Sequence, residues 1–108
     1  MISMDIASFQ RLCRDENFAI TKHAANRLKE RGIRLDDVEH AILDGRIIEE
    51  YPDDTPFPSC LILGTATSGK PLHLVASTDD EMIYLITSYF PDSNRWENDF
   101  ATRKEQRK

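Results

Sequence analysis

A histidine and two arginines are spaced four residues apart in the stretch 21–33. On a helix, His23, Arg27 and Arg31 would lie in one row, because an α-helix turns by about 100° per residue. An imidazole exchanges a proton near neutral pH, and a guanidinium group holds phosphate or carboxylate oxygens through two parallel hydrogen bonds. The spacing therefore predicts a positively charged, titratable row that suits an anionic ligand.

The same stretch carries the signals of a helix that packs on a sheet. Thr21 is of a residue type that caps a helix N-terminus, and Gly32 suits the left-handed residue that ends one. Ala24, Ala25 and Leu28 occupy the arc beside the charged row, so we expect them to face the protein interior. The helix would thus carry the charged row along its edge.

Charge is distributed unevenly along the chain. The 108 residues carry a net charge of -5, which disfavours non-specific nucleic-acid binding by the whole surface. Residues 20–34 hold five basic residues against one acidic residue, whereas residues 36–54 hold eight acidic residues against one arginine. The two runs form either two solvated faces or a basic, phosphate-facing edge on an acidic body.

Length and cysteine content indicate one small domain, 1–108, in a reducing compartment. Apolar residues make up 40% of the chain, as in ordinary globular proteins. Cys13 and Cys60 lack a metal-binding spacing, so we expect reduced thiols, no metal and no cofactor. No signal-peptide pattern opens the chain and no apolar run could span a bilayer, which predicts a cytoplasmic protein.

The pattern of apolar residues predicts an α+β fold in which N-terminal helices pack on a small antiparallel sheet of about four strands. Helices are expected at 4–16, 21–32 and 35–45, with a short edge strand at 18–21. The predicted sheet strands are 46–51, 60–64, 72–76 and 82–89, joined by short polar turns.

Both faces of the last predicted strand are largely apolar. Strict alternation places Ile83, Leu85, Thr87 and Tyr89 on one face, and Tyr84, Ile86, Ser88 and Phe90 on the other. We therefore expect this strand to be central and covered on both sides. After it, Trp96 and Phe100 are expected to pack back on the sheet, and residues 101–108 form a polar tail.

Five blocks in residues 20–96 resemble a bacterial domain-of-unknown-function family with the pattern HAxxRxxERGI…plHvv…iiTxYxPd. The blocks are HAANRLKERGI, DGRIIEEYP, CLILG, KPLHLV and LITSYFPD, followed by Trp96. That family is distantly similar to the RelE-like ribonuclease toxins, including the BrnT and MqsR types. The resemblance implies a RelE-like fold and, as a partner, a cognate antitoxin of the zinc-finger kind.

The resemblance also implies a set of site residues for metal-independent RNA cleavage. This chemistry needs a base for the 2′-OH proton, an acid for the departing 5′-oxygen and cations for the phosphorane. Two histidines can divide the first two tasks. The implied catalytic residues are His23, His73, Thr87 and Tyr89, and the implied phosphate- or RNA-binding residues are Lys22, Arg27 and Arg31. The expected function is an RNA-cleaving toxin of a type II toxin–antitoxin pair, acting on RNA that is free or on the ribosome.

Each of these residues also has a purely structural interpretation. His73 lies in an apolar strand, where a hydrogen-bonded structural histidine is common. His23 could satisfy a backbone group, and Arg27 and Arg31 could pair with the acids of residues 36–54. The alternative function is a non-catalytic binding module of the same fold, whose arginines dock an acidic protein partner. The acidic net charge favours this second interpretation.

Overall fold

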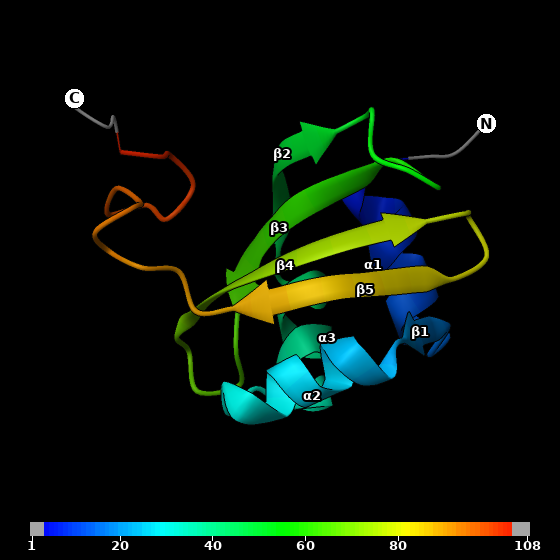
Figure 1. Cartoon of the computed structure of the whole chain (residues 1–108), viewed down its shortest axis with the longest axis horizontal. Helices are drawn as coiled ribbons and strands as arrows, with labels where there is room; N and C mark the ends of the chain where they lie inside the picture. The colour runs from blue at the N-terminus through cyan, green and yellow to red at the C-terminus, as the bar shows by residue number, and fades with distance from the viewer. Residues whose placement is uncertain (1–3, 105–108) are drawn as a thin grey trace.

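The computed structural model describes residues 4–104 and confirms the α+β class. Three helices and five strands alternate only in the first part of the chain, and an uninterrupted run of strands follows (Figure 1). The elements are α1 (Ile6–Arg14), β1 (Phe18–Ile20), α2 (Lys22–Glu30), α3 (Leu35–Leu43), β2 (Arg46–Tyr51), β3 (Ser59–Thr65), β4 (Pro71–Thr78) and β5 (Ile83–Tyr89).

The strands form one mixed sheet in the order β1-β5-β4-β3-β2. Strands β2 to β5 are antiparallel neighbours, as their short polar turns predict. The short edge strand is confirmed as β1, but it pairs with β5 in parallel, with Ile20 beside Leu85. The four predicted antiparallel strands are therefore confirmed, and β1 adds a parallel pair that the polar turns could not indicate, because such turns fix the direction only of strands that follow one another directly.

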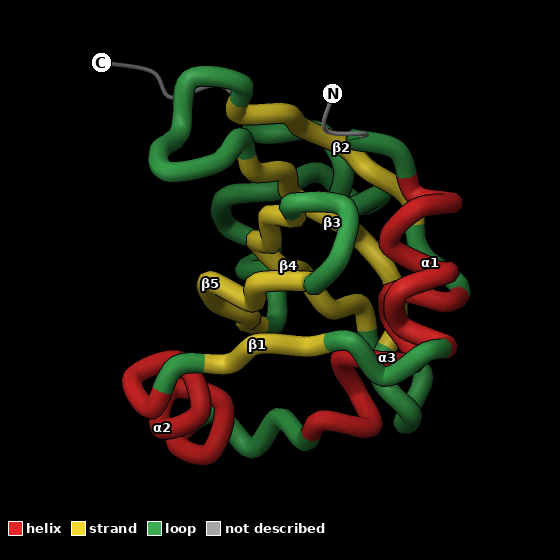
Figure 2. Tube along the Cα trace, turned by 90° about the vertical axis from the view of Figure 1, so that its right-hand side faces the viewer, coloured by secondary structure: helices red, strands yellow, loops and turns green. Residues whose placement is uncertain are grey.

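Helices α1 and α3 cover one face of the sheet, and the other face, called the open face below, has no helix across its centre (Figure 2). Phe9 of α1 and Val38 of α3 are fully buried in this core. The backbone of α3 packs closely against β3 at Gly64, where an added Cβ atom would overlap the Ala41 backbone. The helix layer fixes the sheet and leaves the open face for other roles.

Helix α2 lies at the β1–β5 edge of the sheet (Figure 1), with Ala24 and Leu28 buried. Its predicted start is confirmed, because the Thr21 hydroxyl accepts a hydrogen bond from the Ala24 amide at 3.0 Å. Its predicted end is also confirmed, since Gly32 adopts a φ of 68°. Ala25 is exposed, contrary to the prediction, because only a narrow stripe of this short helix touches the sheet.

A β-bulge in β5 overturns the predicted alternation of its side chains. Val75 pairs with Thr87 and Ala76 pairs with Leu85, so Ile86 is an extra residue on β5. Beyond the bulge, Ser88 is fully buried, whereas Thr87 is only partly buried. Ile86 is 48% exposed, so the prediction that β5 is covered on both sides is wrong at this position.

The segment 91–104, called the C-terminal segment below, packs on the open face opposite α1 (Figure 2). The Trp96 ring lies 4.5 Å from the His73 ring, centroid to centroid, which confirms that this segment returns to the sheet. Arg103 binds Glu49 of β2 through two hydrogen bonds of 2.8 and 3.0 Å. Arg103, which belongs to the predicted polar tail, is thus docked on the sheet; residues 105–108 lie outside the described residues.

Candidate functional site: a basic row on α2 and a covered histidine

The predicted row on α2 is present and faces solvent. Lys22, His23, Arg27 and Arg31, called the α2 basic row below, are all exposed. Arg27 forms an ion pair with Glu30 at 3.4 Å, and its side chain remains 48% exposed. An ion pair of this kind contributes little energy in water, so it leaves Arg27 available to an anion.

Arg31 fixes one end of the row to β5. Its guanidinium donates hydrogen bonds to the Thr87 hydroxyl at 3.0 Å and to the Ser88 carbonyl at 2.8 Å. Two residues of the predicted set, Arg31 and Thr87, thus meet. Among the described residues, neither Arg27 nor Arg31 forms an ion pair with an acid of residues 36–54. The row is anchored to the sheet and is not absorbed into a surface ion network.

His73 and Tyr89 also meet, but inside the protein. The His73 ring is fully buried, and its Nε2–H donates to the Phe100 carbonyl at 2.7 Å. The carbonyl can only accept, so Nδ1 is the acceptor nitrogen and faces the Tyr89 hydroxyl at 3.4 Å. Burial lowers the pKa of His73, against the opposing effect of its bond to Phe100. His73 is therefore a neutral, hydrogen-bonded residue in this structure.

A carboxylate network that the sequence reasoning missed lies beside His73. Arg103 lowers the pKa of Glu49, and Tyr51 also donates to this carboxylate at 2.7 Å. Burial, followed by the bond to Glu49, raises the pKa of Tyr51 to about 12. Glu49 and Tyr51 are two residues apart on one strand and therefore share a face of the sheet. This spacing was the only feature of the sequence that could have indicated their contact.

The structure does not bring His23 and His73 to one accessible site. His23 lies in the first turn of α2, about 12 Å of helix before Arg31, as follows from the rise per residue. His73 pairs with Tyr89 at the far end of β5 and is covered by the C-terminal segment. Only His23 of this pair can reach a ligand in solution without a rearrangement.

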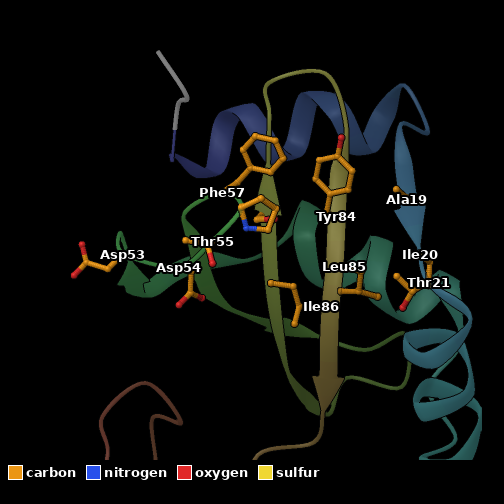
Figure 3. Close-up of a pocket in the computed structure, with 12 residues that line it drawn as sticks. Ala19, Ile20, Thr21, Asp53, Asp54, Thr55, Phe57, Tyr84, Leu85 and Ile86 are labelled. Carbon is orange, nitrogen blue, oxygen red and sulfur yellow. The ribbon is translucent and has the colours of Figure 1, made fainter.

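A cleft of about 840 Å³ lies on the open face next to the start of α2. Figure 3 shows that Phe57 and Tyr84 line one end, Asp53 and Asp54 lie at one side, and Thr21 lies at the opposite side. The cleft was not predicted, because it forms between segments far apart in the sequence. Its lining residues are Ala19, Ile20, Thr21, Asp53, Asp54, Thr55, Pro56, Phe57, Ser77, Tyr84, Leu85 and Ile86.

Metal-ligating side chains are scattered through residues 4–104. Within that range, no group of three or more His, Cys, Asp or Glu side chains could hold a metal ion. The described part of the chain also contains no helix that is long and apolar enough to cross a membrane. Both cysteines are free and buried, and burial raises the pKa of Cys13 to about 11 and that of Cys60 to about 12.

The fold and the site define a small α+β domain with a basic helix at the parallel edge of a mixed sheet. The chain belongs to the family described as "Domain of unknown function (DUF4258)", whose match spans residues 20–90. That match includes the α2 basic row, His73 and Tyr89, but ends before the C-terminal segment. Searches of curated proteins and of solved structures found no match.

Proposed function

We propose that the protein is an RNA-cleaving toxin, a metal-independent ribonuclease of a type II toxin–antitoxin pair that acts in the cytoplasm. The observation that carries this proposal is the exposed α2 basic row, which Arg31 anchors to Thr87 and Ser88. Such a row can hold consecutive phosphates of an RNA strand. The sequence blocks resemble a family that is distantly similar to RelE-like toxins, and this supports the same function.

In the proposed reaction, an imidazole nitrogen of His23 takes the proton of the ribose 2′-OH. The 2′-oxygen forms a bond to phosphorus, the bond from phosphorus to the 5′-oxygen breaks, and that oxygen takes a proton from water. Arg27 stabilises the charge on the pentacoordinate phosphorus. The products are a 2′,3′-cyclic phosphate and a free 5′-OH, and no cofactor is needed.

The remaining residues of the predicted set would position this site. Arg31 and Thr87 hold the end of α2 against the sheet. His73 and Tyr89 support the same part of β5 from the buried side of the C-terminal segment. Under this proposal they affect cleavage through geometry, whereas Lys22, His23 and Arg27 contact the RNA.

The test is incubation of the pure protein with unstructured RNA in EDTA, with and without ribosomes. Wild type should produce 2′,3′-cyclic phosphate ends, and His23→Ala should lose at least about 100-fold in rate, as is typical for a general base. The matched control is His40→Ala on α3. Intact RNA under all these conditions would refute the ribonuclease proposal.

A second function, a binding module for an acidic protein partner, is favoured by the burial of His73. Because His73 is fully buried, the second acid–base group is inaccessible in this structure. The partner would be an acidic protein, the cognate antitoxin of the zinc-finger type. An Arg27→Glu variant that loses this partner, together with a wild type that never cleaves RNA, would establish the binding module instead.

A further inference from the structure

The cleft beside α2 has features that a docking site for a flat ring requires. The rings of Phe57 and Tyr84 lie 5.8 Å apart, centroid to centroid, with only 11° between their planes. The Tyr84 hydroxyl donates to Asp79 at 2.6 Å, which fixes its ring. In Figure 3 both rings present a face to the viewer, so together they form an aromatic platform on the open face.

The charged side chains that line the cleft, Asp53 and Asp54, are both acidic and lie on one side of it (Figure 3). Asp54 accepts a hydrogen bond from the Ser59 hydroxyl. The opposite side is Thr21, the residue that directly precedes Lys22 and His23 of the α2 basic row. A ligand with hydrogen-bond donors at one end and a phosphate at the other would therefore be oriented across the cleft.

We infer that the cleft binds a guanine base of the RNA whose phosphates lie on the α2 basic row. Bases stack on aromatic side chains, and guanine presents adjacent N–H donors on its Watson–Crick edge, which the Asp53 and Asp54 carboxylates can accept. Uracil offers a single N–H between two carbonyl oxygens, which the carboxylates repel. This inference rests on the proposed function, because that function supplies the RNA. It assigns base binding to the cleft, whose residues are separate from the α2 basic row.

The experiment uses guanosine and uridine, because nucleosides lack the phosphate that the basic row would bind. Titration of the full chain, followed by NMR, should shift the ring signals of Phe57 and Tyr84 with guanosine. Uridine should bind at least about 10-fold more weakly, as expected for loss of a hydrogen-bonded pair. Phe57→Ala should weaken guanosine binding by about 5-fold or more, as expected for loss of stacking.

Two further variants keep the test decisive if Phe57→Ala fails to fold. Tyr84→Phe retains the ring but loses its bond to Asp79, so it should weaken guanosine binding less than Phe57→Ala does. Asp53→Asn should reduce the preference for guanosine over uridine. Equal binding of the two nucleosides, or ring signals that do not move, would overturn the inference. RNA cleavage that needs Arg27 but is unchanged in Phe57→Ala would overturn the guanine site alone. Guanosine binding without any action on RNA would support the site and refute the ribonuclease.

Discussion

At the scale of single residues, the same histidine type has two different environments in this protein. His23 is exposed on α2, whereas His73 is fully buried, with its ring held by Phe100 and Tyr89 and covered by Trp96. A buried imidazole disfavours its charged form. His73 therefore supports the open face as a neutral group, and the chemistry proposed above depends on His23.

The burial of His73 predicts a pH dependence of stability. Because its pKa is lowered in the folded protein, the unfolded chain binds the proton first as pH falls below about 6.5. The free energy of unfolding should then fall by up to about 1.4 kcal/mol per pH unit until the folded-state pKa is reached. Urea unfolding at about pH 7.5 and at about pH 5.5 measures this change in the free energy of unfolding. The two pH values lie on either side of the ordinary histidine pKa, about 6.5.

The matched variants for this measurement are His73→Gln and His23→Gln. Glutamine at position 73 can still donate to the Phe100 carbonyl, but it does not titrate. His73→Gln should therefore lose less stability on acidification than wild type. His23→Gln replaces an exposed histidine and keeps His73, so the loss that His73 causes should remain. An identical loss in all three proteins would show that His73 does not control this range.

Arg31 gives a second residue-scale prediction. Arg31→Ala removes two hydrogen bonds to β5, one of them to a partly buried carbonyl. Because the side chain is exposed, the loss should be only about 1 kcal/mol, detectable as a lower thermal midpoint. Lys29→Ala, on the same helix, is the control. An unchanged midpoint in Arg31→Ala would mean that α2 is held by Ala24 and Leu28 alone.

At the scale of elements, the close approach of α3 to β3 depends on a missing side chain. A Cβ atom at Gly64 would overlap the Ala41 backbone, and backbone cannot move aside as a flexible side chain can. Gly64→Ala should therefore lower the free energy of unfolding by about 3 kcal/mol. Gly69→Ala, at an open turn position with a φ of 88°, should cost about 1 kcal/mol. Denaturant unfolding measures the free energy of unfolding of both variants. Equal losses would contradict the conclusion that α3 packs closely against β3 because position 64 has no side chain.

The C-terminal segment is held by Arg103, which binds Glu49 and stacks at 4.6 Å on the Trp96 ring. Arg103→Ala should loosen this segment at a cost of about 1 kcal/mol, because the pair is partly exposed. Trp96 is the single tryptophan of the chain, so acrylamide quenching of its fluorescence should increase. Arg95→Ala is the control, and equal quenching in both variants would contradict the role given to Arg103.

Local sequence signals predicted the elements well, and they failed where distant segments meet. The Thr21 cap, the Gly32 terminus and the strands up to Tyr89 follow from residue types and spacing. The parallel pairing of β1 with β5 and the bulge at Ile86 depend on contacts across the sheet. The cleft was missed for the same reason, and so was the docking of Arg103 on Glu49.

At the scale of the whole molecule, a net charge of -5 coexists with an exposed basic row. An acidic surface repels RNA, so RNA should bind only at the α2 basic row, and its affinity should fall as the salt concentration rises. The family match over residues 20–90 contains the row. Under the proposed function, the α2 basic row contacts RNA phosphates.

The most direct test is the affinity of the full chain for a fluorescent single-stranded RNA across a salt series, with ribosome-free protein. Wild type should lose affinity as salt rises, with a slope of about -0.7 for each phosphate contacted. Arg27→Glu should bind more weakly and with a shallower slope, whereas Arg14→Glu on α1, with the same change of charge, should keep the wild-type slope. Equal affinities and slopes for the two variants would contradict the claim that the α2 basic row is the RNA site.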